Sequence, residues 1–279
     1  MTVTAAVPTI WLMLLPHLRD NGLKLPTLGR VVIGGSSCPR AVIEAFQNEF
    51  GVRVIHAWGM TETSPLGTLC SFKPEIAALP EAERLETQLT VGHPPFTVDI
   101  ALRDEEGHDL PWDGQTQGRL MVRGSGVVRR YLKQEADSTD AQGWFDTGDA
   151  ATVTPLGYVR ITDRFKDVIK SGGEWISSID LENFAVGHPD VAEAAAVAVA
   201  HPKWDERPVL VIVPRPGKSP PPAEIIDRLR PHFAKWQLPD DVILVEEIPH
   251  TATGKISKLR LRELLDGMGY RHPDLRQGG

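Results

Sequence analysis

Short apolar runs alternate with an amphipathic stretch near the start of the chain. The runs "GRVVIGG" (29–35) and "VRVIHAW" (52–58) are rich in β-branched residues, and "SSCPRAVIEAFQNEFG" (36–51) between them repeats apolar residues at helical spacing. We expect a serine cap, Pro39 in the first turn and Gly51 as the stop of this helix. This order predicts a βαβ unit with parallel strands, whose carboxyl ends are where open α/β sheets bind ligands.

The first 16 residues, "MTVTAAVPTIWLMLLP", are apolar enough to be mistaken for a signal peptide. They have no basic leading segment, they contain Pro8, and they are too short to span a bilayer. We therefore expect a buried strand followed by a helix capped at Thr9, and no integral membrane segment. Because a parallel sheet needs partner strands on both sides, we also expect further sequence upstream of Met1.

From about residue 91 the pattern changes to short strands separated by turns, which predicts a β-rich, barrel-like subdomain. Farther on, the buried strands "AAAVAVAHP" and "RPVLVIVP" and the amphipathic helix "PPAEIIDRLRPHFAKW" predict a compact α+β domain. The expected fold is thus α/β and α+β. Its expected parts are an α/β segment (1–90), a β-rich segment (91–162), a hinge (163–166) and a small second domain (167–279).

Composition narrows the kind of partner. The chain has 279 residues, is 41% hydrophobic and 24% charged, and carries a net charge of -7. It is therefore not disordered, and a general attraction to nucleic acid or to anionic membranes is not expected, so any anion site must be local. Cys38 and Cys70 are too few for a disulfide framework, which indicates a reducing compartment, by default the cytoplasm.

Three segments carry candidate chemistry. In "HAWGMTETS" (56–64), Trp58 offers a surface for a planar base, Gly59 permits close approach, and Glu62 offers oxygen to Mg²⁺. In "WFDTGD" (144–149), the carboxylate of Asp149 has acceptors for a pair of ribose hydroxyls. Taken alone, the first segment is explained equally well by a plain polar turn, and the second is explained better by a turn-capping aspartate. "DRFKDVIKSGGEWIS" (163–177) gathers basic residues around a glycine pair, which suggests a local anion site.

Two glycine motifs do not fit the patterns that they suggest. In "HTATGKIS" (250–257), Pro249 stands where a phosphate loop needs its first glycine, and Ile256 follows the lysine. In "GSGVVR" (124–129), Arg129 replaces the third glycine of a dinucleotide-binding loop. What remains is Lys255 on a mobile glycine turn, where it can meet an anion as a flexible point charge or be an ordinary surface lysine.

Six motifs taken together favour a functional site over ordinary turns and surface residues. In chain order they are "GGSSCP", "WGMTETSP", "GRLMVRGSGVVRRYL", "WFDTGD", "DRFKDVIKSGGEWIS" and "TATGKI". In order and spacing they resemble the adenylate-forming superfamily, which includes acyl-CoA synthetases, luciferases and peptide-synthetase adenylation domains. The resemblance extends over nearly the whole chain. Within the superfamily, "KDVIKSGGEWISSIDLEN" is most similar to fatty acyl-CoA synthetases and to relatives acting on medium-chain and methylthio-substituted propionic acids.

The resemblance implies an acid–thiol ligase that joins a carboxylic acid to ATP and then transfers the acyl group from acyl-AMP to CoA. Residues 1–162 would be the C-terminal portion of a large AMP-binding domain, and 167–279 a small mobile domain. The implied partners are a small-molecule acid, ATP with Mg²⁺, and CoA, without nucleic acid, and a homodimer is left open.

The resemblance also assigns roles residue by residue. The adenine and acyl-phosphate pocket would be walled by Gly34, Gly35, Ser36, Ser37, His56, Ala57, Trp58, Gly59, Met60 and Thr61. Glu62 would hold Mg²⁺, Asp149 the ribose, and Arg164 the ribose or phosphate. Lys166 would be the hinge, and Lys255 would stabilise charge during adenylation. Thioester formation would use Lys170 with Ser171, Gly172, Gly173, Glu174 and Trp175, a turn flat enough for pantetheine to pass.

One departure from the superfamily leaves alternatives open. Its glycine-rich and Ser/Thr-rich phosphate loop has no match in this sequence. We therefore expect a fragment or a shortened gene model of an acyl-CoA synthetase that does not adenylate by itself. The alternatives are an adenylating enzyme that loads a carrier protein, and a non-catalytic remnant that binds nucleotide or acyl-CoA.

Overall fold

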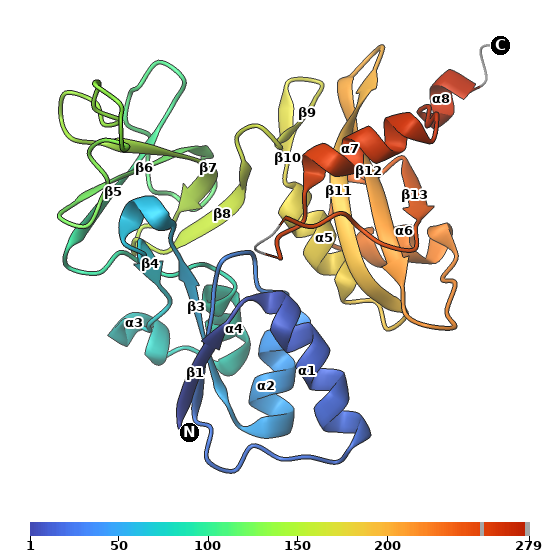
Figure 1. Cartoon of the computed structure of the whole chain (residues 1–279), viewed down its shortest axis with the longest axis horizontal. Coiled ribbons are helices and arrows are strands. Elements are labelled where there is room, and N and C mark those ends of the chain that lie inside the picture. Colours follow the sequence, from blue (N-terminus) through green and yellow to red (C-terminus); the bar gives the residue numbers. More distant parts are fainter. Residues whose placement is uncertain (252–253, 277–279) are drawn as a thin grey trace. The chain divides into compact units, whose positions relative to one another are not determined.

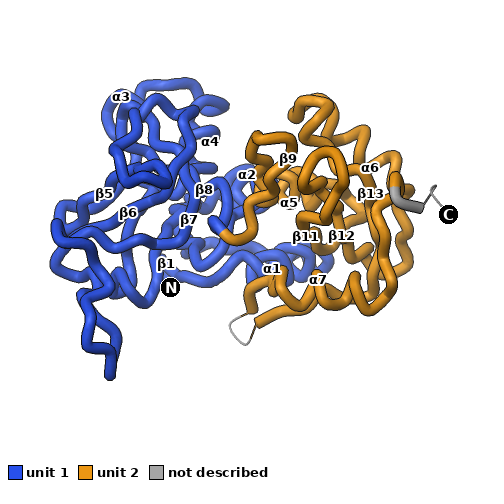
Figure 2. The backbone as a smooth tube through the Cα atoms, turned by 90° about the horizontal axis from the view of Figure 1, so that it is seen from above, with its two compact units in different colours: residues 1–165 blue, residues 166–279 orange. Residues whose placement is uncertain are grey.

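The computed structural model describes residues 1–251 and 254–276 of the chain. These residues divide into two compact units, residues 1–165 and residues 166–279, which Figure 2 draws in blue and orange. The boundary lies within the segment expected as a hinge. Asp163 and Arg164 of that segment belong to the last strand of the first unit, and Lys166 begins the second. That this boundary acts as a hinge stays a prediction.

The first unit starts with a small sheet covered by two helices that lie side by side in Figure 1. In spatial order its strands are β1 (Val3–Ala6), β2 (Arg30–Ile33), β3 (Arg53–Trp58) and β4 (Thr68–Leu69). The first three strands are parallel and β4 is antiparallel to β3. Helices α1 (Pro8–Asp20) and α2 (Arg40–Phe50) are the crossovers, so the predicted βαβ unit is confirmed. Their apolar side chains, with Trp11 against Phe46 at 5.3 Å between ring centroids, form the core with β2 and β3.

Three local expectations for this region are wrong. Helix α1 begins at Pro8 after Val7, without the predicted cap at Thr9, because the fixed φ of proline already suits a first helical position. Helix α2 follows Pro39, whose extended backbone starts the helix without a serine cap. The residues of β1 alternate between exposed and half-buried, so this strand is not buried. The predicted stop at Gly51 is confirmed by its left-handed backbone, with φ of 66°.

The β-rich part of the first unit is an antiparallel sheet in the order β5-β6-β7-β8. Its strands are β5 (Val98–Arg103), β6 (Gly118–Gly124), β7 (Phe145–Val153) and β8 (Val159–Arg164). Two short helices precede it, α3 (Pro74–Ala77) and α4 (Glu81–Gln88). The register between β7 and β8 shifts between Ala150 and Ala151, where Thr162 is the extra residue on β8, and Asp149 lies opposite Arg164 of β8.

The second unit is a five-stranded sheet between helices. Its strands are β9 (Ile169–Ser171), β10 (Glu174–Ile176), β11 (Val191–His201), β12 (Asp205–Pro214) and β13 (Asp241–Leu244). Its helices are α5 (Ser178–Val186), α6 (Pro222–Leu229), α7 (Lys258–Gly267) and α8 (Pro273–Arg276). The predicted amphipathic helix ends at Leu229, earlier than expected, because Pro231 lacks the backbone donor that continuation would need. A separate 3₁₀ turn, η2 (Lys235–Gln237), follows it.

Alternation along β11 and β12 builds the three layers of this unit. Ala196 and Leu210 face α5 and α6, whereas Ala195 and Val209 face α7. All four side chains are fully buried. Because β11 carries mostly alanine, the helices approach its backbone closely on both sides. The β11–β12 hairpin is thus a rigid platform for the segments attached to its ends.

Candidate functional site

The residues predicted for the nucleotide site of the first unit meet at one carboxylate. Trp58, at the end of β3, donates from Nε1 to Oδ2 of Asp149 at 2.9 Å. Arg164 Nε lies 2.8 Å from Oδ1 of the same side chain. Asp149 is 3% exposed, so its charge is buried beside a cation and an indole N–H. The sequence predicted the three residues but not that they contact one another.

The local backbone fixes this carboxylate. Gly148 has φ of 69°, a conformation that glycine adopts without strain, and it turns the chain between Thr147 and Asp149. Oγ1 of Thr147 accepts the N–H of Asp149 at 3.1 Å, and the carbonyl of Thr147 accepts Nη1 of Arg164 at 3.2 Å. The "DTGD" turn therefore holds Asp149 and Arg164 through main-chain contacts as well as through their ion pair.

Two predicted pocket glycines have structural reasons to be glycine. A Cβ on Gly59 would lie 1.8 Å from the carbonyl oxygen of Pro65, and one on Gly34 would lie 2.8 Å from the carbonyl oxygen of Ala57. Both distances are shorter than real Cβ contacts, so each glycine permits close backbone packing at the ends of β2 and β3. Gly35 takes φ of 88°, which turns the chain after β2.

His56, on β3, is a buried histidine inside the predicted pocket wall. It is 2% exposed, and among the described residues neither ring nitrogen has a hydrogen-bond partner. Burial lowers the pKa of His56 to about 4, against a smaller opposite influence from the nearby backbone of Thr90, Gln88 and Ser36. The ring is therefore neutral at pH 7 and adds no charge to the site.

Glu62 lies in the short 3₁₀ turn η1 (Thr61–Thr63) that follows β3. Its Oε1 accepts the hydroxyl of Tyr131 at 2.8 Å, and this contact raises the pKa of Tyr131. Its backbone carbonyl accepts the N–H of Val128 at 2.7 Å. The "GSGVVRRYL" segment therefore packs against the turn that carries Glu62. Sequence reasoning missed Tyr131, although it lies within one of the quoted motifs.

The surroundings of Glu62 fit a magnesium ion that is shared with a substrate. The side chain is half-buried, and its Oε2 has no hydrogen-bond partner among the described residues of this unit. No second acidic or histidine side chain joins Glu62 in a cluster of potential metal ligands within the described ranges. Mg²⁺ commonly takes one protein carboxylate, with phosphates and water as its other ligands. A single free carboxylate oxygen satisfies that requirement.

The glycine pair predicted for thioester formation is the turn of a two-residue β-hairpin in the second unit. Strands β9 and β10 pair with Glu174 opposite Ser171 and Trp175 opposite Lys170. Gly172 and Gly173 have φ of 62° and 88°, the positive values that such tight hairpin turns require. Near a Cβ placed on Gly173, no described atom lies within 4 Å, whereas one on Gly172 would lie 3.1 Å from the indole of Trp204.

The side chains around this hairpin differ in exposure. Lys170 and Glu174 are exposed, Trp175 is half-buried, and Ser171 is 5% exposed. The backbone N–H of Lys170 donates to the carboxylate of Glu206 at 2.8 Å, and the Lys170 side chain is exposed. The hairpin thus offers a positive charge and an indole beside an open glycine.

Lys255, predicted for adenylation, lies on a separate turn of the second unit. Thr251 N–H donates to the carbonyl of Lys255 at 2.7 Å, and the bridge between His250 and Ile256 closes the turn. The side chain of Lys255 is exposed. Ala252 and Thr253 of this motif lie outside the described residues.

A partly buried ion pair ties the start of α7 to α5. Lys258 lies 2.9 Å from the carboxylate of Glu182 and also donates to the hydroxyl of Ser178. Glu182 in turn accepts the N–H of Ala196 at 2.9 Å. This contact connects the segment after Lys255 with the helix that follows the glycine hairpin, and no local sequence pattern indicates it.

The predicted residues thus fall into two groups, one in each unit. In the first unit the group is Gly34, Gly35, Ser36, Ser37, His56, Ala57, Trp58, Gly59, Met60, Thr61, Glu62, Asp149 and Arg164. In the second it is Lys166, Lys170, Ser171, Gly172, Gly173, Glu174, Trp175 and Lys255. Direct contacts join Trp58, Asp149 and Arg164. The roles of both groups stay predictions.

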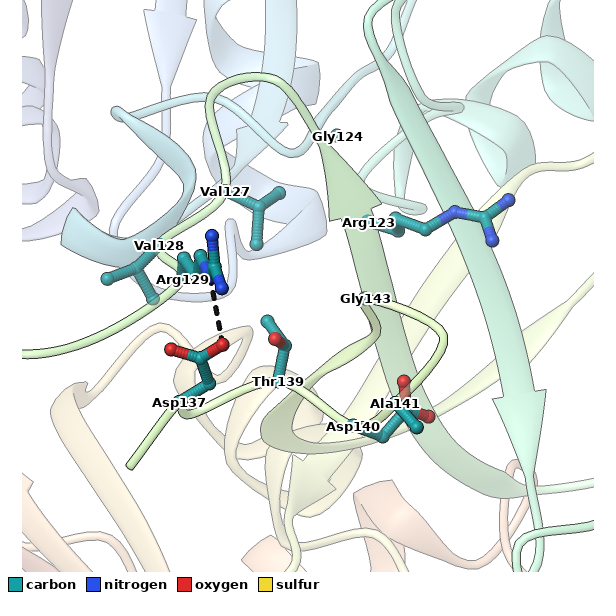
Figure 3. A pocket seen from close by; sticks show the side chains of 10 residues that line it. All are labelled: Arg123, Gly124, Val127, Val128, Arg129, Asp137, Thr139, Asp140, Ala141 and Gly143. Carbon is teal, nitrogen blue, oxygen red and sulfur yellow. Dashed lines mark hydrogen bonds and ion pairs between the residues drawn. The ribbon is translucent and has the colours of Figure 1, made fainter. Parts of the chain in front are cut away.

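A surface pocket of about 410 Å³ lies in the β-rich part of the first unit, and Figure 3 shows its lining. It lies between the 123–129 segment and the 137–143 segment, where Arg129 Nε is 2.8 Å from Asp137. None of the predicted site residues lines it. This pocket is therefore separate from the candidate site.

Sequence comparison decides the family. The model of the AMP-binding enzyme family matches residues 1–132, and that of the AMP-binding enzyme C-terminal domain matches residues 180–255. The chain belongs to the AMP-binding enzyme family. It is 49% identical over 262 residues to a 3-methylmercaptopropionyl-CoA ligase of Ruegeria lacuscaerulensis, which covers 94% of this chain and 49% of that protein. It is 45% identical over 262 residues to a medium-chain-fatty-acid–CoA ligase of Ectopseudomonas oleovorans, over 94% of this chain and 48% of that protein.

Solved structures agree with this assignment. The anthranilate CoA ligase AuaEII in complex with anthranoyl-AMP aligns with a TM-score of 0.81 at 26% identity, over 94% of this chain and 49% of that one. The o-succinylbenzoate CoA synthetase MenE of Bacillus subtilis, in complex with its acyl-adenylate intermediate, gives 0.78 at 28% identity, over 94% and 51%. The chain spans about half the length of the curated relatives it matches. Among the helices in the described part of the chain, none is long and apolar enough to cross a membrane.

Proposed function

We propose that this chain performs thioester formation for an acyl-CoA ligase, transferring an acyl group from acyl-AMP to CoA. The observation that carries the proposal is the glycine hairpin of the second unit, where Gly173 has φ of 88° and open surroundings between Lys170 and Trp175. A narrow thiol-bearing arm can pass a glycine where it could not pass a side chain. The similarity to named CoA ligases at 45–49% identity supports the same reading.

The proposed reaction breaks one bond and forms another. The CoA sulfur attacks the acyl carbonyl carbon, the bond between that carbon and the phosphate oxygen of AMP breaks, and AMP leaves with the electron pair. The thiol proton passes to solvent. Negative charge develops on the acyl oxygen and on the departing phosphate, where a positioned cation stabilises it. We assign this task to the ammonium group of Lys170.

The first unit is proposed to hold the AMP portion. Trp58 and Arg164 occupy one lone pair on each oxygen of Asp149, at 2.9 and 2.8 Å. The carboxylate oxygens of Asp149 are proposed to accept the two ribose hydroxyls. Both neighbours hold this carboxylate in one orientation, which favours a bidentate contact with the ribose.

The whole protein is proposed to make acyl-AMP from ATP as well, with Lys255 and Glu62 serving that step. Glu62 would hold Mg²⁺, which when bound neutralises phosphate charge. Tyr131 keeps the carboxylate in place through its 2.8 Å hydrogen bond. The acid is proposed to be a fatty or methylthio-substituted propionic acid, as the names of the relatives suggest. The free, buried Cys38 and Cys70 support a cytoplasmic location.

The test uses the 279-residue chain and chemically prepared acyl-AMP, so that adenylation is not needed. Octanoyl-AMP and 3-(methylthio)propanoyl-AMP are each mixed with CoA, and acyl-CoA is measured by chromatography. We expect acyl-CoA well above the uncatalysed rate. A chain that releases no acyl-CoA from either compound contradicts the proposal. A pantetheinylated carrier protein offered in place of CoA tests the carrier-loading alternative in the same assay.

A further inference from the structure

The glycine hairpin is docked onto the turn between β11 and β12 at two adjacent residues. Gly172 N–H donates to the carbonyl of Trp204 at 2.9 Å. Ser171 accepts Nη1 of Arg207 at 3.1 Å through its hydroxyl, and Asp205 pairs with Ser171 in the sheet. The position of the hairpin therefore depends on what holds Trp204 and Arg207.

Arg207 is held by the partly exposed carboxylate of Asp240. The guanidinium is bidentate with Asp240, through Nε at 2.7 Å and Nη2 at 2.6 Å. Its remaining donors go to Ser171 and to the carbonyls of Trp236 and Leu238. Arg207 is 7% exposed. Burial alone would raise the pKa of Asp240, but the hydrogen bonds and charge of Arg207, with a smaller contribution from His272, lower it.

The C-terminal segment provides the second partner of that carboxylate. His272 is 1% exposed, and its Nε2 lies 2.9 Å from Oδ2 of Asp240. Nδ1 of His272 accepts the N–H of Asp274 at 3.2 Å, so the ring proton is on Nε2 and is donated to Asp240. The first connection thus runs from His272 through Asp240 and Arg207 to Ser171.

A second connection starts two residues later. Asp274 lies 3.1 Å from Nε2 of His201, whose Nδ1 accepts the N–H groups of Lys203 and Trp204 at 3.1 and 3.2 Å. These contacts order the turn in which the carbonyl of Trp204 accepts the N–H of Gly172. Both ring nitrogens of His201 are used, as are those of His272, so the pair is satisfied without a cation. The two rings also meet edge to face at 4.9 Å.

We propose that His272 and Asp274 are positioning residues that fix the Gly172–Gly173 hairpin for thioester formation. The proposal rests on the proposed function of this hairpin. Two chains of hydrogen bonds, linked to each other through the N–H of Asp274, lead from His272 and Asp274 to the adjoining hairpin residues Ser171 and Gly172. Loss of either connection lets the hairpin sample other positions. The open side of Gly173 then has the orientation that thioester formation needs for a smaller fraction of the time.

The chain contains a matched control. His188 is also buried, at 5% exposure; its Nδ1 accepts the N–H of Asp190 at 3.2 Å, and its Nε2 faces Glu224 at 3.4 Å. This repeats the local geometry of His272 elsewhere in the second unit. His188→Leu and His272→Leu therefore remove similar interactions, and only the second lies on a connection to the hairpin.

The experiment measures acyl-CoA formation from octanoyl-AMP in the 279-residue chain. We expect His272→Leu to lower kcat about tenfold with little change in the KM for octanoyl-AMP, and His188→Leu to leave kcat within about twofold. His272→Gln keeps a nitrogen donor and should restore most of the rate. Equal losses in the two leucine variants, or no loss in His272→Leu, overturn the proposal.

A second measurement separates this inference from the proposed function. Amide hydrogen exchange of the 169–176 peptide reports the hairpin directly, and we expect His272→Leu, but not His188→Leu, to speed it about tenfold. If the unaltered chain makes no acyl-CoA, the proposed function fails, and exchange still decides whether His272 positions the hairpin. Unchanged exchange in His272→Leu refutes the positioning role.

Discussion

Nε1 of Trp58 donates a 2.9 Å hydrogen bond to Oδ2 of Asp149, joining the end of the parallel sheet to the β-rich sheet of the same unit. Trp58 is therefore more than a flat surface for a base. Its ring is oriented by a buried charge, and the carboxylate is oriented by the ring. Any ligand that uses one of these residues also meets the other.

Trp58→Phe should expose this dependence. Phenylalanine keeps an aromatic face but removes the donor, so Oδ2 of Asp149 loses a partner in a site where Asp149 is only 3% exposed. We expect the KM for octanoyl-AMP in acyl-CoA formation to rise about tenfold. Trp144→Phe is the control, because Trp144 stacks on Arg103 and Arg123 instead. An unchanged KM in Trp58→Phe would show that the hydrogen bond does not serve binding.

Gly173→Ala separates function from backbone strain. Gly173 and Gly217 both have positive φ, 88° and 73°. A Cβ added to either glycine would have no atom of the described residues within 4 Å, apart from its chain neighbours. Alanine at each position should cost about 1 kcal/mol of unfolding free energy. Only Gly173→Ala should also slow acyl-CoA formation from acyl-AMP, by about tenfold or more, because only its methyl group narrows the thiol path. Chemical denaturation and the acyl-transfer assay, run on both variants, check this pair of outcomes.

The two lysines of the second unit should differ in one half-reaction. Lys170→Ala removes the charge proposed for thioester formation, and we expect conversion of acyl-AMP to acyl-CoA to slow about 100-fold. Lys255→Ala, on the separate turn, should leave this conversion within about twofold, because its charge is assigned to adenylation. Single-turnover assays with excess chain make the comparison. Equal losses would contradict the division of tasks.

His56 should make the stability of the chain depend on pH. Its pKa is lowered to about 4, so the unfolded chain binds more protons between pH 4 and the ordinary value near 6.5. Its contribution is complete above pH 6.5 and is lost as pH falls through this window, by roughly 3 kcal/mol in all. Urea denaturation at pH 7 and 4.5 should show a steeper loss in the unaltered chain than in His56→Leu. Parallel losses in the two proteins would rule out the buried neutral ring.

Asp240 does not interfere with that measurement. Its pKa is lowered in the folded chain, so its contribution to stability is present above the ordinary carboxyl value near 3.9 and disappears only as pH falls below it. The change in unfolding free energy between pH 7 and 4.5 therefore does not include the loss of the Asp240 contribution.

The sequence predicted the parts of the fold that depend on local pattern. Apolar periodicity predicted the βαβ unit. Gly51 ends α2 as expected, because a helix end of this kind needs only one residue with a left-handed backbone, which glycine adopts readily. The predicted caps were wrong: α1 begins at Pro8, whose fixed φ suits a first helical position, and α2 begins at Arg40 after the extended Pro39, both without a polar cap. A cap is one of several ways to start a helix, and the choice among them depends on neighbouring backbone.

Contacts between distant segments were beyond local pattern. Arg207 opens an apolar strand and reads as a solvent-exposed end, yet it is buried because Asp240 and three carbonyl or hydroxyl oxygens accept all its donors. By sequence Tyr131 is an ordinary loop residue. In the structure, the hydrogen bond from Val128 to the carbonyl of Glu62 holds this segment where Tyr131 contacts the Glu62 carboxylate. Such pairs arise from tertiary packing, which places a polar partner only after both segments have folded.

The alanine-rich strand β11 has a consequence for variation among descendants of this sequence. Ala195 and Ala196 are fully buried and face opposite layers, so a larger side chain at either position presses on a helix that has no solvent-filled space to move into. Substitutions should therefore accumulate slowly in β11 and quickly in exposed loops such as 215–221. A saturation-mutagenesis library selected for folded protein would recover mostly small residues at these two positions, which marks this part of β11 as a segment with little room to evolve.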